Sequence, residues 1–257
     1  MEVEGSRYSV LGVEIDDLTP STAVDRAREL IERKEGGYLV FCTVSTVVTS
    51  GDDPELLTSL RQASVVAPDG MPLVWLGRRA GFSTERVYGP DFLLHLLERT
   101  GGAYRHFLYG GAPGVAEKLA AELRRRFPLV KIVGTESPPF GAALHDRTAW
   151  NLDKVINASP DLVWVGLGHP RQEKWMRLHH QALGGAVAAG VGAAFDFLSG
   201  EKKEAPSWMK RSGLQWMHRL LSEPQRLWRR YLIGNSRFIA RILHEKAGER
   251  QRQRKGG

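Results

Sequence analysis

The sequence has almost no cysteine and no long apolar run, and both absences narrow what the protein can be. Cys42 is its only cysteine, so no internal disulfide can form and nothing points to an oxidising compartment. The longest apolar stretch, residues 184–195, is shorter than the ~20 residues that a membrane-spanning helix needs. The acidic start MEVEGSRYSV has no basic-then-apolar signal pattern. We therefore expect a cytoplasmic protein.

The patterns that usually hold metal ions are missing as well. The chain has no cysteine–histidine cluster and no closely spaced set of carboxylates. It also has no Asp-x-Asp motif, which is one common way of holding a metal on a nucleotide diphosphate. We expect neither a metal ion nor another cofactor.

Charge is distributed unevenly along the chain. The net charge is +7, but residues 201–257 hold 15 Lys/Arg and 5 Asp/Glu, a net of +10, which leaves −3 for residues 1–200. Such a basic segment suits nucleic acid, an anionic membrane surface or a phosphate-bearing substrate.

Short apolar runs alternate with amphipathic segments from residue 8 to about residue 198, which favours an α/β fold with a mostly parallel sheet and helices on both faces. We predict strands at residues 8–15, 38–43, 64–70, 106–110, 130–135, 161–168 and 186–192. We predict helices at residues 19–33, 71–79, 91–99, 114–127, 146–158 and 171–180. Binding loops should gather at the carboxyl edge of this sheet.

The pattern changes after residue 200, which gives three predicted regions. Residues 1–200 form the α/β domain, and residues 201–245 form an appendage of two or three helices broken near Pro224 and Gly234. Residues 246–257 are too polar to pack and are predicted to be disordered.

Two aspartates follow predicted strands or begin predicted helices. Asp69 lies in a Pro-Asp-Gly turn at a strand end, where it can cap the next helix or serve as a general base for a hydroxyl nucleophile. The two interpretations are about equal from spacing alone. Asp91, in YGPDF, repeats the theme, and for it the helix-cap interpretation is the better one.

Glycine-rich turns follow two other strands. Gly110 and Gly111 lie in FLYGGAPG, where bare backbone N–H groups can cradle a diphosphate, although a tight turn explains them equally well. The stretch VGLGHPRQEKWM places Gly166, Gly168 and Gln172 where flexible backbone and polar side chains meet at the beginning of a helix.

Hydroxyl and imidazole groups add weaker signals. Thr43 and Ser45 come just after a strand and can bind a sugar or phosphate, but capping explains them equally well. His169 can act in acid–base chemistry, although a lone loop histidine is more often a surface residue.

The basic segment mixes aromatic residues with arginines at helical spacing. Trp208, Trp216 and Trp228 stand among Arg219, Arg226 and Arg229, a pattern that suits a membrane interface. A packed terminal helix with a solvated charged face is the plain alternative, and nucleic acid is a third. The apolar side of this segment can also pair protomers into a homo-oligomer.

Several blocks together resemble one family. APDGMPLVW, FLYGGAPGVAEKLAAEL, VWVGLGHPRQEKWM and APSWMKRSGLQWMHRLLSEPQRLWRRYL look like the WecG/TagA/CpsF glycosyltransferases, glycosyltransferase family 26, over roughly residues 9–239. The resemblance implies a Rossmann-like fold and an inverting, metal-independent transfer of a sugar such as N-acetylmannosamine. It also implies a UDP-sugar donor and a polyprenyl-diphosphate-linked sugar as the acceptor, at the inner face of the cell membrane.

The resemblance also assigns residues. Asp69 matches the family's proposed catalytic base, and Thr43 and Gln172 match pocket residues. Arg219, Arg226 and Arg229 match appendage arginines that are thought to grip the diphosphate.

Two positions depart from the family pattern. Ser45 replaces the usual asparagine of T-x-N, and Pro90 precedes Asp91 where the family has threonine or serine. The first departure lies in the substrate pocket, so it leaves open which sugar is bound. It does not change the expected reaction class.

Two other functions are compatible with the residues alone. A non-catalytic sugar-nucleotide-binding regulator would share the phosphate cradle without needing a base. A nucleic-acid-binding protein would use the basic segment, and its binding would fall steeply with salt.

Overall fold

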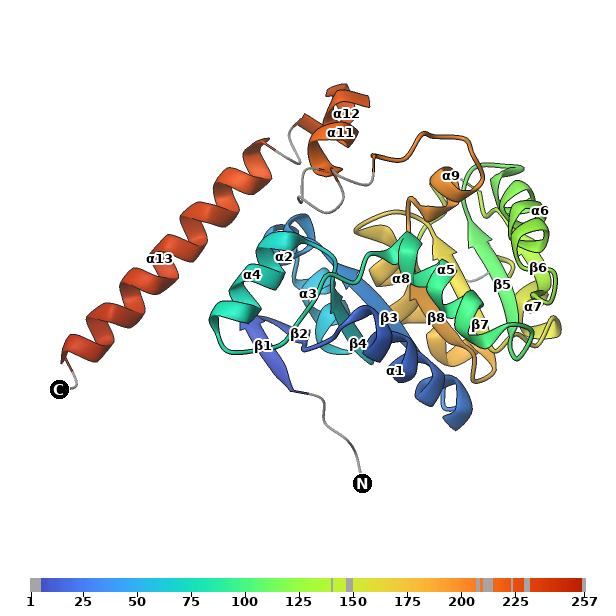
Figure 1. Cartoon of the computed structure of the whole chain (residues 1–257), viewed down its shortest axis with the longest axis horizontal. Helices are drawn as coiled ribbons and strands as arrows, with labels where there is room; N and C mark the ends of the chain where they lie inside the picture. Colours follow the sequence, from blue (N-terminus) through green and yellow to red (C-terminus); the bar gives the residue numbers. More distant parts are fainter. Residues whose placement is uncertain are drawn as a thin grey trace.

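The molecule is built on one six-stranded parallel sheet. The computed structural model describes residues 6–139, 141–146, 150–206, 209, 215–222, 224–228 and 232–255. The strands lie side by side in the order β4-β3-β8-β7-β5-β6, and every neighbouring pair is parallel (Figure 1). Their bounds are β3 Gly37–Cys42, β4 Val65–Pro68, β5 Arg105–Gly110, β6 Lys131–Glu136, β7 Leu162–Gly166 and β8 Val187–Gly190.

Both faces of the sheet are covered by helices, as the alternating pattern predicted. Leu39 and Phe41 of β3 point into a core shared with α1, α5, α6 and α9, whereas Tyr38 and Val40 point into a core shared with α2, α3, α4 and α8. The helices of the body are α1 Pro20–Arg33, α2 Val44–Ser50, α3 Pro54–Arg61, α4 Met71–Arg79, α5 Gly89–Thr100, α6 Val115–Arg126, α7 Leu152–Asn157, α8 Arg171–His179 and α9 Ala194–Leu198, with a 3₁₀ turn, η2, at His180–Leu183.

The first apolar run forms two strands instead of the single predicted one. β1 Arg7–Val10 and β2 Val13–Asp16 pair antiparallel across a turn at Leu11 and Gly12, both with positive φ. Two residues with positive φ make the tight turn that joins antiparallel strands, and this turn divides the run. The hairpin packs beside β4, where Asp16 Oδ2 accepts a hydrogen bond of 2.6 Å from Val66 N.

Two helices between β3 and β4 were not predicted. α2 begins at Val44 and is capped by Thr43, whose hydroxyl accepts a hydrogen bond from Thr46 N at 3.3 Å, while the Thr46 hydroxyl accepts from Thr43 N in return. α3 begins at Pro54 and is capped by Asp53, whose carboxylate accepts a hydrogen bond from Leu56 N at 3.0 Å. Threonine and valine are weak helix formers, so helix propensity alone did not predict α2.

Helices also make up the described part of the chain after residue 209. α11 Gln215–Ser222 ends just before α12 Pro224–Trp228, and α13 begins at Gly234, so the breaks lie at the predicted proline and glycine. α13 runs to Lys255, so it includes residues 246–255 of the segment that was predicted to be disordered. Alanine, glutamate, arginine, glutamine and lysine are good helix formers, so this polar segment can extend a helix without packing.

The appendage meets the body through α13 and α2 (Figure 1). Phe238 is buried in the core beside α2, and the guanidinium of Arg241 donates to Val48 O at 3.1 Å and to Asp52 at 2.7 Å. Leu232, Ile239 and Leu243 are more than half exposed nearby. None of the helices in the described ranges is both long enough and apolar enough to cross a membrane.

Candidate active site

The carboxyl ends of the strands surround a cavity of about 820 Å³. Parallel strands all deliver their carboxyl ends to one edge, so residues far apart in the chain meet there. Its walls come from loops after each of the six strands: Thr43, Asp69, Gly111, Ser137, Gly168 and Gly192.

Asp69 stands at this edge and is held by an arginine. Its backbone N–H donates to Cys42 O at 2.8 Å, which ties the loop after β4 to the end of β3. Arg86 Nη2 lies 3.0 Å from Asp69 Oδ1, and Arg86 Nε donates to Asp69 O at 2.6 Å. The two side chains are 12% and 18% exposed. α4 is capped by Gly70 without a side-chain bond, so Asp69 is not its cap.

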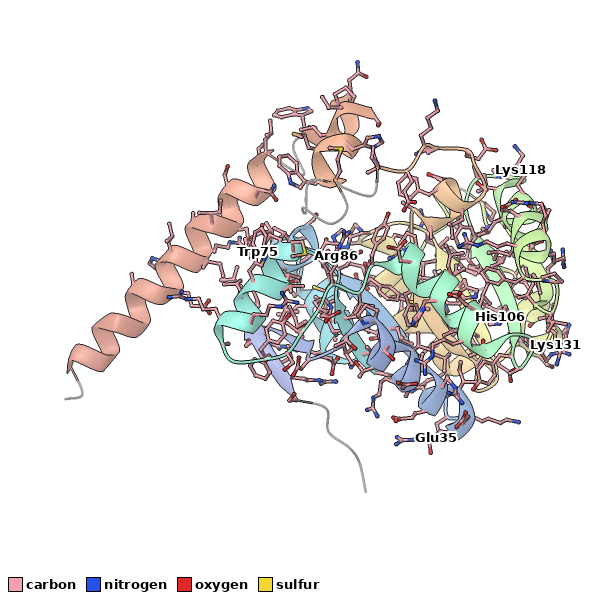
Figure 2. The ribbon with its side chains drawn as sticks, in the orientation of Figure 1. Glu35, Trp75, Arg86, His106, Lys118 and Lys131 are labelled. Atoms are coloured by element: carbon pink, nitrogen blue, oxygen red, sulfur yellow. The ribbon has the colours of Figure 1, made fainter. Side chains whose placement is uncertain are left out.

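Arg86 is a site residue that the sequence analysis missed. It comes from the segment before α5, 17 residues beyond Asp69, and no local motif links the two. Its guanidinium also lies 4.6 Å from the ring centroid of Tyr88. Figure 2 shows Arg86 far from His106, which lies near the start of β5.

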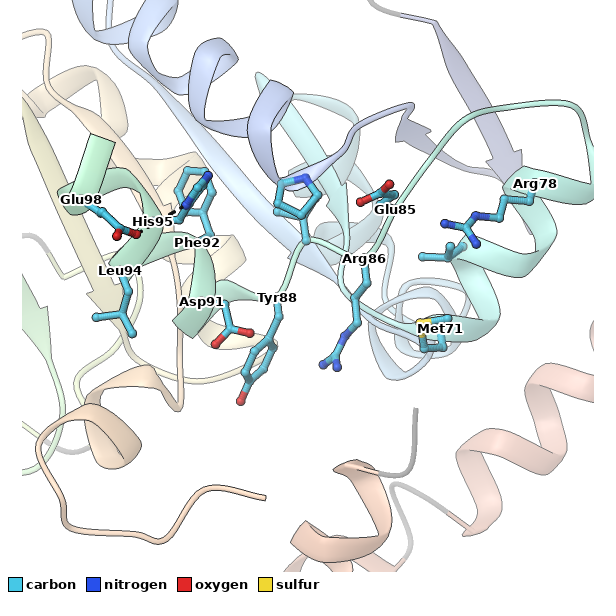
Figure 3. Close-up of a pocket in the computed structure, with 13 residues that line it drawn as sticks. Met71, Arg78, Glu85, Arg86, Tyr88, Asp91, Phe92, Leu94, His95 and Glu98 are labelled. Atoms are coloured by element: carbon cyan, nitrogen blue, oxygen red, sulfur yellow. Dashed lines mark ion pairs between the residues drawn. The ribbon is translucent and has the colours of Figure 1, made fainter. Parts of the chain in front are cut away.

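A smaller groove of about 550 Å³ adjoins the cavity, and Tyr88 borders both. Asp91 lies in the first turn of α5 and lines the groove rather than the cavity. Arg86, Tyr88 and Asp91 lie on one side of the segment that joins α4 to α5 (Figure 3). The N-cap of α5 is Tyr88, with no side-chain cap hydrogen bond, so Asp91 is not the cap that its position suggested, and its binding role stays a prediction.

Only some of the residues after β3 line the cavity. Thr43 and Thr46 line the cavity, but Ser45 is not among its lining residues. Successive helical residues are rotated by about 100°, so the cap and the third residue of α2 share a face that Ser45 does not. The structure therefore brings Thr43 to the site and leaves Ser45 beside it.

The glycines after β5 and β7 shape part of the cavity wall, and the N–H of Gly111 is already engaged. Gly111 N already donates to Gly166 O at 3.0 Å, so this N–H does not form the predicted phosphate cradle. Gly110 has a φ of +131°, and a Cβ there would lie 2.6 Å from Gly166 C. Gly111, Gly166 and Gly168 border the cavity, whereas Gly110 does not. The absence of a side chain at Gly110 therefore permits the close approach of two strand ends.

The beginning of α8 places three polar side chains at the cavity. Gln172 Nε2 donates to Gly190 O at 2.9 Å and lies 3.4 Å from Glu173 Oε1. His169 Nδ1 lies 3.1 Å from the same carboxylate oxygen. The His169 side chain is only 10% exposed, so it is not the surface residue expected from its loop position, and the side chain of Glu173 is only 1% exposed.

Burial governs the ionisation of the nearby thiol. Burial, with added repulsion from the carboxylates of Glu173 and Asp69, raises the pKa of Cys42 far above its usual range. The thiol therefore stays protonated, which removes it as a nucleophile. Among the residues that the structure describes, no group of three or more His, Cys, Asp or Glu is placed to hold a metal ion.

The predicted arginines of the appendage cannot be placed around the cavity. Arg219 and Arg226 belong to α11 and α12, but their side chains lie outside the described residues. Arg229 lies outside them altogether.

Comparison with known proteins identifies relatives over nearly the whole chain. The model of the glycosyl transferase WecG/TagA/CpsF family matches residues 8–252. An N-acetylglucosaminyldiphosphoundecaprenol N-acetyl-beta-D-mannosaminyltransferase of Bacillus spizizenii is 31% identical over 219 residues, covering 84% of this chain and 83% of the relative. An enzyme of the same name from Bacillus subtilis strain 168 is 28% identical over 225 residues, covering 87% and 85%.

Proposed function

Because the chain belongs to the WecG/TagA/CpsF family of glycosyltransferases, we propose that it transfers a hexose or N-acetylhexosamine from a UDP-sugar to a polyprenyl-diphosphate-linked sugar. N-acetylmannosamine is the leading candidate for the transferred sugar. The names of the two relatives support both the acceptor class and this sugar. The product would serve a bacterial surface polysaccharide or cell-wall polymer.

The observation that carries the proposal is the position of Asp69. Its carboxylate borders a cavity at the carboxyl edge of the sheet, and Arg86 fixes its orientation through bonds to both the side chain and the backbone. A carboxylate within reach of the acceptor hydroxyl can act as general base, an effect typically worth ~10²–10⁴-fold.

The proposed step is one displacement with inversion. The acceptor oxygen forms a bond to the anomeric carbon while the bond from that carbon to the diphosphate oxygen breaks. The hydroxyl proton passes to Asp69, and the electron pair of the broken bond leaves with UDP. The negative charge that develops on the diphosphate is proposed to be stabilised by Arg219, Arg226 and Arg229. A guanidinium group suits this role because it can donate two parallel hydrogen bonds to the oxygens of one phosphate.

A transfer assay tests this function. UDP-sugars that include UDP-N-acetylmannosamine are supplied singly, with a short-chain polyprenyl-diphosphate N-acetylglucosamine acceptor, and both UDP release and the glycolipid product are measured. We expect release with one donor, only when the acceptor is present, and at the same rate in EDTA. UDP binding without any transfer would instead favour a sugar-nucleotide-binding regulator.

We also propose that the appendage brings the enzyme to the inner face of the membrane as a peripheral protein. Residues 201–257 carry a net charge of +10, and Leu221, Leu232, Ile239 and Leu243 are more than half exposed. Such helices bind anionic lipid through charge and apolar contact together. Vesicles with 30% anionic lipid should sediment the protein at low salt, while neutral vesicles should not. Equal sedimentation with both would contradict this role.

A further inference from the structure

One corner of the cavity is made by three side chains from the beginning of α8. His169 Nδ1 and Gln172 Nε2 lie 3.1 and 3.4 Å from one oxygen of Glu173. All three residues line the cavity that Asp69 borders, and all three side chains are nine-tenths or more buried. This His169–Gln172–Glu173 corner is therefore a polar surface built into the interior.

The hydrogen positions in the corner follow from the partners. His169 Nδ1 faces a carboxylate oxygen, so it carries a proton. Gln172 Nε2 faces two acceptors, Gly190 O and Glu173 Oε1, so the amide nitrogen must lie there and the amide oxygen on the other side. That oxygen packs toward Gly192, where an added Cβ would lie 3.2 Å from it.

Three polar atoms of the corner are left over. His169 Nε2, Gln172 Oε1 and Glu173 Oε2 are buried and have no hydrogen-bond partner among the described residues. Two of them are acceptors regardless of the protonation of His169. An unsatisfied buried polar atom costs roughly 1–3 kcal/mol, so three such atoms on residues that line one cavity indicate a ligand that completes them.

The chemistry of these atoms selects the kind of ligand. A diphosphate offers only acceptors, so it cannot satisfy Gln172 Oε1 or Glu173 Oε2, and its charge would oppose the buried carboxylate. A sugar hydroxyl offers a donor and an acceptor together, and the N–H of an acetamido group is a donor. We propose that the His169–Gln172–Glu173 corner binds the hydroxyl or acetamido groups of the transferred sugar, an inference that rests on the proposed function.

Two affinities measured on each variant test this assignment. UDP and the UDP-sugar that serves as donor are titrated separately into wild type, Glu173→Gln and His169→Phe, with calorimetric detection. If the corner holds the sugar, each variant should bind the UDP-sugar about 10-fold more weakly, equivalent to ~1.4 kcal/mol, and UDP within about 2-fold of wild type. The second variant covers the case in which the first does not fold.

Lys174→Met supplies a matched control on the same helix. Lys174 forms ion pairs with Asp53 at 2.7 Å and Glu55 at 3.1 Å on α3, and it does not line the cavity. This variant should be somewhat less stable but should bind both ligands as wild type does.

The remaining outcomes would overturn the assignment. Equal weakening of UDP and UDP-sugar by Glu173→Gln and His169→Phe would mean that the corner serves the nucleotide or the fold. Unchanged affinities for both ligands would mean that it touches neither. Failure of wild type to bind UDP or any UDP-sugar would contradict the proposed function itself, and the inference with it.

Discussion

Polar groups are buried at both the amino edge and the carboxyl edge of the central sheet, but they have different roles at the two edges. At the amino edge, His106 stacks against Trp164 at 6.1 Å between centroids, and neither of its ring nitrogens has a partner among the described residues. Next to it, Asp161 accepts from Arg105 N at 2.8 Å and its own N–H donates to Arg105 O at 2.8 Å. These groups fasten β5 to the chain before β7.

At the carboxyl edge, polar groups border a cavity. Asp69 is oriented by Arg86, and His169 is oriented by Glu173. His169 Nε2 and Glu173 Oε2 nevertheless have no hydrogen-bond partner among the described residues. His106 and His169 are both buried histidines, but only His169 has a carboxylate partner and a place in a cavity wall. Burial of a titratable group is therefore not enough to mark a site, whereas an oriented group beside a cavity is.

The largest expected effect concerns stability at the amino edge. Burial lowers the pKa of His106 to about 4, against 6.5 for the free side chain. As the pH falls from about 6.5 to about 4, His106 binds a proton in the unfolded chain but stays neutral in the folded protein. Stability is therefore lost over this range. The loss from this group is roughly 3 kcal/mol.

Replacement of this histidine should remove that loss. Denaturant unfolding of wild type and His106→Phe at several pH values gives the difference in unfolding free energy. This difference should shift in favour of the variant by roughly 3 kcal/mol between pH 7 and pH 4. A difference that does not change with pH would show that His106 is not the titrating group.

A smaller effect is expected from the arginine at the carboxyl edge. Arg86→Met removes the bonds that orient the Asp69 carboxylate, so kcat in the transfer assay should fall about 10- to 100-fold. The matched control is Arg78→Met. Arg78 lines the adjoining groove and donates to Thr84 O at 2.9 Å, and its loss should leave kcat within about 2-fold. Equal losses in both variants would point to general positive charge instead of orientation.

The smallest effect should separate the two edges. Asp161→Ala removes one hydrogen bond to Arg105 N and should lower the free energy of unfolding by ~1 kcal/mol at pH 7.5. Because Asp161 is not part of the cavity, transfer activity at 25 °C should not change. If Asp161→Ala lowered activity without lowering stability, the amino edge would not be purely structural, contrary to the difference inferred between the two edges.

The sheet and most of its helices could be predicted because the apolar runs are bounded by clear turn residues. The α/β class, the parallel arrangement of the sheet and the strand that precedes Asp69 are confirmed. The hairpin at Leu11 and Gly12 was missed because a two-residue turn interrupts an apolar pattern without changing its composition. Helix α2 was missed because its threonines and valines resemble a strand.

The site could be predicted only where a residue follows its own strand. Thr43, Asp69 and Gln172 were placed at the carboxyl edge by position alone, and the structure puts all three at one cavity. Arg86 depends on how the α4–α5 segment folds back toward Asp69, which no local spacing encodes, whereas His169 and Glu173 are four residues apart at a helix start and this spacing could have indicated the pair. The three appendage arginines remain predictions.

Asp69 is proposed to act as the base when a sugar is transferred in the carboxyl-edge cavity. The most direct test is the single-turnover transfer rate of wild type and Asp69→Asn, each saturated with the same UDP-sugar and given the same acceptor. If Asp69 takes the proton, the variant should be slower by ~10²–10⁴-fold while its affinity for UDP stays unchanged. Equal rates in the two proteins would contradict the claim.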